Sequence, residues 1–376
     1  MTTSPPDPGP PTPRSGRHSA RGTPRSRAST EVAGVARYVA GRFQSGVGAV
    51  AVTVVAVALV AGLTAFALKA IAPNRPAPQA ASASGSAPIG SFSHHHVVIT
   101  LPPAPDSYLG AYADGVPRSY ASLQSLADAT GTRPNVALYY SGWGEPFQAS
   151  FATKAADHHA VPLVQIDPAN VSLAAIADGT YDPYLETFAT AVASYGAQTG
   201  HGVIIGFGHE PNGTWYPWGV RHVSAATWVA AWRHIVDVFR QQGADDVTWL
   251  WTVNIIDAPN GIPSPARWWP GSSYVTWVGI DGYYYKPSWT FPSLFGPTIT
   301  AVRSVTLDPI LISETAAAPA AGQSAKIANL FAGIHSYGLL GLVWFDADRQ
   351  QDWRLKTPAA IAAFRQDAKS FKNPVS

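Results

Sequence analysis

Cysteine is absent from this 376-residue sequence. Without a thiol, the chain forms no disulfide, carries no cysteine-based zinc site and has no cysteine nucleophile. Charged residues are also scarce, at 13%, whereas hydrophobic residues make up 46%. This balance excludes a wholly disordered chain and is typical of a well-buried globular body accompanied by an apolar segment.

Basic charge is confined to the N-terminal end. Residues 1–45 carry seven Arg against Asp7 and Glu31, a net charge of +5, so the rest of a chain of net charge +2 sums to −3. We predict that this Pro- and Ser-rich tail is disordered, because it buries too little apolar surface to offset its ordering entropy. A basic tail before a slightly acidic body does not indicate a nucleic-acid-binding protein.

Residues 46–68 form an uncharged apolar run of 23 residues that consists mainly of Ala and Val. About 20 residues of helix cross the hydrocarbon core of a bilayer, so this run predicts a single transmembrane helix. The Arg-rich tail 1–45 then lies in the cytoplasm, and a Pro/Ala/Ser-rich linker at 69–99 leads to an extracellular domain at 100–376. A cleaved signal peptide followed by secretion is the alternative.

Strand-like and helix-like segments alternate from about residue 100 onward. Eight apolar runs read as strands: Tyr108–Ala113, Val136–Tyr140, Pro162–Asp167, Val203–Phe207, Val247–Asn254, Trp277–Tyr283, Pro309–Ser313 and Gly341–Phe345. Most are continuously apolar, as strands buried on both faces should be, and helical patterns lie between them. Eight such alternations predict an α/β fold, the (β/α)₈ or TIM barrel, which we expect to be monomeric.

Two of the five Glu residues emerge directly from apolar runs. Glu210 follows the fourth predicted strand and Glu314 follows the seventh. The active site of a barrel forms at the C-terminal strand ends, so we expect these carboxyls to face each other. One carboxyl could then protonate a glycosidic oxygen while the other attacks the anomeric carbon. Alternatively, each Glu pairs with a nearby Arg or caps the next helix.

Aromatic residues gather around these positions. Trp215 and Trp218 lie in a Gly/Pro-rich loop after Glu210, and Trp143 and Trp344 stand at other predicted strand ends. Sugar rings present C–H faces that lie on aromatic rings, so this composition favours a carbohydrate cleft. No carboxylate and His cluster has the spacing of metal ligands, and we predict neither metal nor cofactor.

The segment G-F-G-H-E-P-N-G-T-W-Y-P-W-G at 206–219 resembles the acid/base motif of glycoside hydrolase family 26, the β-mannanase family in a clan of retaining (β/α)₈ glycosidases. Most of that clan has Asn before the acid/base Glu, and His209 points to this family. The segments 277–283, 309–316 and 343–348 resemble its strands six, seven and eight. The similarity covers roughly residues 105–360.

The resemblance implies a retaining mechanism with Glu210 as acid/base and Glu314 as nucleophile, about 5–5.5 Å apart. It also implies supporting roles: His209 and Asn212 contact the sugar or orient Glu210, Tyr283 binds Glu314, Trp344 lies under the sugar, Trp215 and Trp218 serve the leaving-group side, and Trp143 serves the opposite side. Gly206 departs from the family pattern, in which many members carry Arg.

The sequence therefore predicts an endo-acting hydrolase of a β-mannan-like polysaccharide at the cell membrane. The same chemistry on a β-glucan, a β-1,3-xylan or an envelope glycan stays open, because Gly206 bears on substrate choice. A non-catalytic surface barrel that binds glycans is the alternative from a different functional class.

Overall fold

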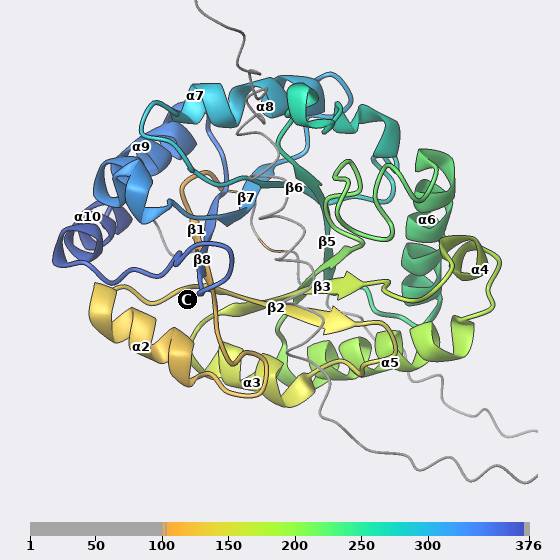
Figure 1. Cartoon of the computed structure of the whole chain (residues 1–376). Coiled ribbons are helices and arrows are strands. Elements are labelled where there is room, and N and C mark those ends of the chain that lie inside the picture. Colours follow the sequence, from red (N-terminus) through yellow and green to blue (C-terminus); the bar gives the residue numbers. More distant parts are fainter. Residues whose placement is uncertain (1–100, 102–103, 372–376) are drawn as a thin grey trace, which may run out of the picture.

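The computed structural model describes residue 101 and residues 104–371. Eight parallel strands follow one another around a closed barrel in chain order, with helices outside them (Figure 1). The strands are β1 (Tyr108–Ala113), β2 (Val136–Gly142), β3 (Val161–Asp167), β4 (Val203–Phe207), β5 (Val247–Asn254), β6 (Trp277–Asp281), β7 (Ile310–Thr315) and β8 (Gly341–Asp346). The predicted (β/α)₈ barrel is confirmed.

Two strand ends differ from the sequence prediction in ways that matter for the cleft. β7 continues through Glu314 to Thr315, so Glu314 belongs to the strand rather than following it. β6 ends at Asp281, which places Tyr283 in the loop beyond the strand. Loop residues at the carboxyl end of a barrel strand are well placed to reach a ligand.

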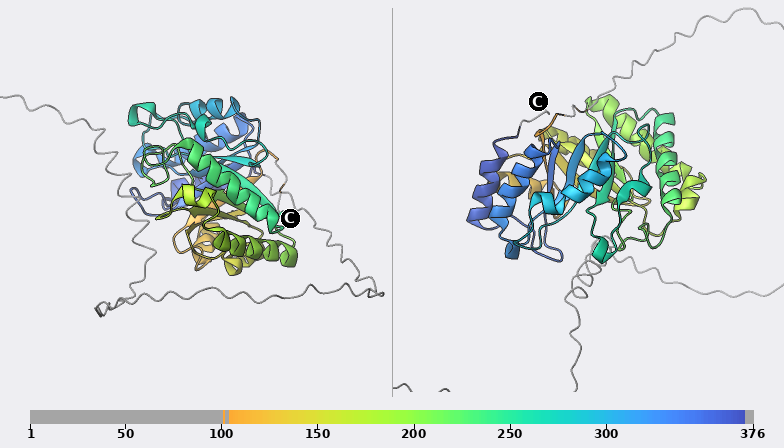
Figure 2. Two further views of the ribbon diagram at one scale, coloured as in Figure 1. Left: turned by 90° about the vertical axis from the view of Figure 1, so that its right-hand side faces the viewer. Right: turned by 90° about the horizontal axis from the view of Figure 1, so that it is seen from above.

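Helices cover the outside of the barrel, as Figures 1 and 2 show from three directions. They are α2 (Ala121–Thr130), α3 (Ala149–Asp157), α4 (Leu173–Ala177), α5 (Asp182–Thr199), α6 (Ala225–Gln241), α7 (Phe291–Leu294), α8 (Gly296–Arg303), α9 (Gln323–Ser336) and α10 (Pro358–Ala368). The β5–β6 connection carries the 3₁₀ turns η1 (Ala258–Asn260) and η2 (Pro265–Trp268) in place of an α-helix.

Helix α6 illustrates how sequence signals place these elements. Ser224 caps its N-terminus by accepting a hydrogen bond from the Thr227 amide. Its buried face includes Trp228, Trp232 and Ile235, at spacings of four and three residues. Such a stripe packs against the barrel while the cap satisfies one of the free amides at the helix start.

A polar layer crosses the barrel interior beneath the mouth. Gln165 of β3 donates to Thr252 of β5 over 2.9 Å, passing the intervening strand β4 at Gly206. A Cβ atom at Gly206 would lie 2.0 Å from Gln165 Oε1, so only glycine leaves room for this bond. Gly279 on β6 likewise gives space to Thr252 and Ser313. Alternate strands therefore fill the layer, as is typical of this fold.

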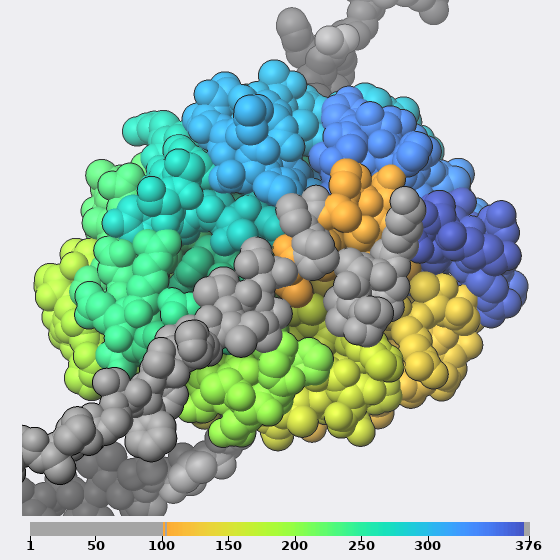
Figure 3. All heavy atoms as spheres, turned by 180° about the vertical axis from the view of Figure 1, so that it is seen from behind, coloured from red at the N-terminus to blue at the C-terminus, as the bar shows by residue number. Residues whose placement is uncertain are grey.

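The chain enters the barrel at the face opposite the carboxyl strand ends. The amides of Asp106 and Ser107 donate to the carbonyls of Leu339 and Leu340, just before β8. Figure 3 shows the segment leading into β1, in orange, at the centre of this reverse face. The mouth, where β1 to β8 end, lies on the other side.

The predicted tail (1–45), membrane helix (46–68) and linker (69–99) all lie outside the described residues. Among the helices that the structure does describe, none combines the length and apolar character needed to span a membrane.

Replacing Gly206 with Ala should lower the free energy of unfolding by about 1–3 kcal/mol, because the added methyl overpacks the interior against Gln165. The Gln165→Ala change should relieve this clash, so the double variant should be more stable than the sum of the two single effects. Urea denaturation of the unaltered protein, the two single variants and the double variant measures the coupling free energy between positions 206 and 165. Gly142→Ala is the control, since its Cβ would approach Glu145 only to 3.5 Å. Strict additivity would contradict this account.

Candidate active site

The two candidate carboxylates meet in one cleft at the carboxyl ends of the strands. Glu210 and Glu314 are 5% and 4% exposed, respectively. The cleft is lined by Glu210, Trp215, Asn254, Ile255, Gly282, Tyr283, Tyr285, Glu314 and Gln350. The tertiary structure thus brings together two glutamates that lie more than a hundred residues apart in the sequence.

A bulge in β7 sets the position of Glu314. Ile310 pairs with Val278 and Leu311 with Gly279, but Glu314 pairs with Asp281, which leaves one extra residue in β7. The pairing with β8 shifts within the same stretch. A bulge bends its strand and re-aims the side chains that follow it.

Glu314 is held by the loop after β6. The Tyr283 hydroxyl donates to Glu314 Oε1. The Tyr283 ring in turn packs on Trp353, with 4.6 Å between ring centroids, and lies edge-on to Phe345. Aromatic packing therefore fixes the hydroxyl that contacts the carboxylate.

A tight turn places Glu210. Its φ angle of 54° lies in the left-handed region that few residues other than glycine adopt. Two backbone bonds hold this conformation: the Glu210 amide donates to the Thr252 carbonyl and the Gly213 amide donates to the Glu210 carbonyl. Strained backbone of this kind persists where the surroundings determine it, and it clusters at functional sites.

Both oxygens of Glu210 accept hydrogen bonds from donors of different elements. Trp215 Nε1, in the loop after β4, lies 2.7 Å from Oε2. Asn254 Nδ2, at the end of β5, lies 2.6 Å from Oε1. The surroundings of Glu210 thus differ from those of Glu314, as a division of labour between two carboxyls requires.

His209 and Trp218 form a buried support behind the turn. Trp218 is 1% exposed, stacks on Tyr216 at 4.4 Å and donates to the His209 carbonyl. His209 Nε2 lies 2.8 Å from the Tyr216 hydroxyl, and Nδ1 lies 3.0 Å from Asp167 Oδ1. Both the ring and the N–H of Trp218 are used inside the protein, and its predicted role on the leaving-group side stays a prediction.

Asn212 also acts inside the protein, by fixing a neighbouring strand end. It is fully buried and makes reciprocal bonds of 2.9 Å with the Asn254 backbone, donating to the carbonyl and accepting from the amide. Its second donor contact is the Pro263 carbonyl. Of the two roles expected for Asn212, this geometry favours orienting Glu210, through Asn254.

Trp344 packs between β8 and α10 and is not among the residues that line the cleft. It is fully buried and packs against Phe364 of α10, with 5.7 Å between ring centroids. The next residue, Phe345, instead stacks on Tyr112 at 4.7 Å and contacts Tyr283. Alternate side chains of a strand face opposite sides, so Trp344 and Phe345 point away from each other, and the predicted role of Trp344 under a sugar stays a prediction.

Trp143 lies outside the cleft that contains the carboxylates. It is partly buried and packs against Tyr184 and Tyr181, at 4.9 and 5.6 Å between centroids. Its predicted role on the opposite side of the substrate stays a prediction.

Sequence reasoning missed Asn254 and Gln350 as parts of the site. Asn254 is the last residue of β5 and its only side-chain amide, a signal that could have identified it. Gln350 lies in the long β8–α10 connection, where no periodicity indicates which residues face the cleft.

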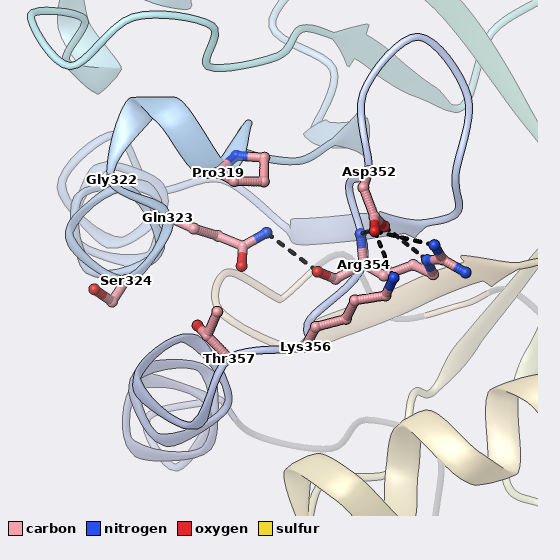
Figure 4. Close-up of a pocket in the computed structure, with 8 residues that line it drawn as sticks. All are labelled: Pro319, Gly322, Gln323, Ser324, Asp352, Arg354, Lys356 and Thr357. Carbon is pink, nitrogen blue, oxygen red and sulfur yellow. Dashed lines mark hydrogen bonds and ion pairs between the residues drawn. The ribbon is translucent and has the colours of Figure 1, made fainter.

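Charged contacts hold the β8–α10 connection in place. Asp352 accepts from Arg354 and Lys356, and Figure 4 shows these bonds beside a second cavity, which lies between the start of α9, the β8–α10 connection and Thr357, the N-cap of α10. Hydrogen bonding to Arg354 holds the pKa of Asp352 well below its usual range. At the start of the connection, Asp346 accepts from the Leu355 amide over 2.7 Å, and burial raises the pKa of Asp346 to about 6.

In the part of the chain that the structure describes, no group of three or more acidic, His or Cys side chains is arranged to hold a metal ion.

Substituting Trp344 with Phe should lower the free energy of unfolding by about 1–3 kcal/mol, because it leaves a cavity between β8 and α10. The matched change Trp215→Phe alters a partly buried side chain and removes its hydrogen bond to Glu210. It should lower the free energy of unfolding less than Trp344→Phe does. Thermal and urea unfolding of both variants measure the difference. Equal stability of Trp344→Phe and the unaltered protein would contradict a packing role.

The raised pKa of Asp346 predicts that ionisation of this carboxyl lowers the free energy of unfolding. Because its folded value exceeds its ordinary value of 3.8, stability is lost as pH rises from about 4 to about 6. Asp346→Asn keeps an oxygen that accepts from the Leu355 amide and removes the charge. The variant should therefore raise the free energy of unfolding by about 1–3 kcal/mol at pH 7.5 and leave it unchanged near pH 3.5. Unfolding across pH tests this. Asp348→Asn, at an exposed ion pair, is the control; a pH-independent effect of Asp346→Asn would refute the assignment.

Comparisons with known proteins agree with this geometry. Residues 178–320 match the model of glycosyl hydrolase family 26. The chain is 30% identical over 275 residues to Endoglucanase H of Acetivibrio thermocellus, which covers 69% of this chain and 30% of that relative's length.

The fold resembles two solved structures at 15% identity. One is the Bacillus subtilis mannanase man26, with a TM-score of 0.54 over 70% of this chain and 86% of that chain. The other is the catalytic domain of the Bacillus sp. JAMB-750 endo-beta-1,4-mannanase, with a TM-score of 0.54 over 70% and 85%. The matched family model and the sequence relative together show that this barrel is similar to glycosyl hydrolase family 26, with the family match itself confined to residues 178–320.

Proposed function

We propose that this chain is a retaining endo-glycoside hydrolase that cleaves a β-linked polysaccharide of the β-mannan type. The observation that carries the proposal is the convergence of Glu210 and Glu314 in one cleft, each held by a different set of donors. Two carboxyls that must perform different tasks need different surroundings.

In the first step, Glu314 attacks the anomeric carbon while Glu210 donates its proton to the departing glycosidic oxygen. The bond to the leaving sugar breaks and a glycosyl ester to Glu314 forms. In the second step, Glu210 takes a proton from water, whose oxygen displaces Glu314. Both carboxyls return to their starting states, and the anomeric configuration is retained.

The local contacts support these roles. Glu314 accepts a bond from the Tyr283 hydroxyl, which steadies the carboxylate before attack. Glu210 lies beside Trp215, whose ring is only half-buried and lines the cleft, so the leaving group is expected on this side. Tyr285 and Gln350 complete the wall around Glu314.

The names of the related proteins bear on substrate. The structural neighbours are named as mannanases, and the sequence relative is named as an endoglucanase. We therefore propose β-mannan first and β-glucan second, with endo action in both cases. Gln165 fills the space at Gly206, where many family members are expected to carry Arg, so this interior position bears on which polymer fits.

The change Glu314→Gln should lower hydrolysis of the preferred polysaccharide by at least about 1,000-fold, since it removes the nucleophile. Reducing-sugar release from mannan, mixed-linkage β-glucan and β-1,3-xylan measures this. A 2-fluoro glycoside should label Glu314 covalently, as peptide mass spectrometry can show. Glu186→Gln, exposed on α5, is the matched control and should retain full activity.

The alternative of a glycan-binding barrel makes the opposite prediction. Saturable binding of a polysaccharide by the unaltered protein, without hydrolysis and without labelling of Glu314, would overturn the proposed function and favour that alternative.

A further inference from the structure

The end of β5 contributes a side chain to the cleft that no motif assigns. Asn254 is 9% exposed, and its amide nitrogen lies 2.6 Å from Glu210 Oε1. Building on the proposed function, we propose that Asn254 is a positioning residue that holds the acid/base Glu210 in its working orientation.

Asn254 is itself held so that it has little freedom to move. The side chain of Asn212 donates to the backbone carbonyl of Asn254 and accepts from the backbone amide of Asn254, at 2.9 Å each. Asn212 lies two residues after Glu210, in the same turn. Hydrogen bonds join Glu210 to Asn254 and Asn254 to Asn212, and the backbone from Glu210 to Asn212 completes the link between the β4 turn and the end of β5.

This link has a chemical consequence for Glu210. Glu210 stands in a left-handed turn, and Asn254 donates to its Oε1. Oε2 then lies beside Trp215, which lines the cleft. An acid works only when its oxygen lies within hydrogen-bond reach of the atom that it protonates, so this orientation affects the protonation step itself.

The side-chain amide of Asn254 also suits a carboxylate partner. An Asn N–H can only donate, and the carboxylate oxygen Oε1 accepts this bond. The other titratable groups that line the cleft are Glu314, Tyr283 and Tyr285, and the variants below leave all three in place.

The test compares Asn254→Ala with the unaltered protein on aryl glycosides whose leaving groups need or do not need protonation. With a poor leaving group, kcat/KM should fall about 10- to 100-fold, because the acid is misaligned. With a dinitrophenyl leaving group, the loss should be several-fold smaller. Asn260→Ala, an exposed Asn in the same β5–β6 connection, is the matched control and should change neither rate.

Asn254→Asp keeps the size of the side chain and provides a second readout. Its carboxylate would face Glu210, so the alkaline limb of the kcat/KM profile should move to higher pH. A purely structural role would lower activity without moving this limb. Equal losses for both leaving groups together with an unmoved limb would overturn the inference, and so would full activity of Asn254→Ala.

The Glu210→Ala variant, measured in parallel, separates this inference from the proposed function. If the unaltered protein cleaves no glycoside and Glu210→Ala changes nothing, the proposed function fails, and the role of Asn254 fails with it. If Glu210→Ala shows the leaving-group dependence of an acid but Asn254→Ala does not, only the inference about Asn254 is wrong.

Discussion

The pairing of β8 with β1 is the constraint on which the site depends. All six residues of β1 pair with β8, and this closes the sheet. Closure places eight carboxyl strand ends around one mouth, so residues far apart in the chain become neighbours. Without it, Glu210 on the β4 side and Glu314 on β7 would share no cleft.

Beneath the mouth, small residues make the polar interior possible. Gly206 lets Gln165 reach Thr252, and Gly279 leaves space for the side chains of Thr252 and Ser313. Ser313, which directly precedes Glu314 in β7, donates to Asp281 of β6 over 2.6 Å. Buried polar groups need such partners, so the layer supports the strand ends that carry the carboxylates.

Each glutamate then depends on a local departure from regular structure. Glu210 needs a left-handed turn tied to β5, and Glu314 needs a bulge in β7. The donors differ accordingly: an indole and an amide for Glu210, and a tyrosine hydroxyl for Glu314. Two chemically identical side chains thus acquire the different surroundings that acid and nucleophile require.

The sequence by itself determined the barrel and the placement of Glu210 and Glu314 at strand ends, because continuous apolar runs and helix caps are local signals. It could not determine which way Trp344 points, since a strand buried on both faces is apolar on both. Nor could it show that Asn254 reaches Glu210 across 44 positions, or that Trp218 is buried. Only the tertiary structure decides such contacts, because they join loops and strand ends whose approach follows from closure of the barrel.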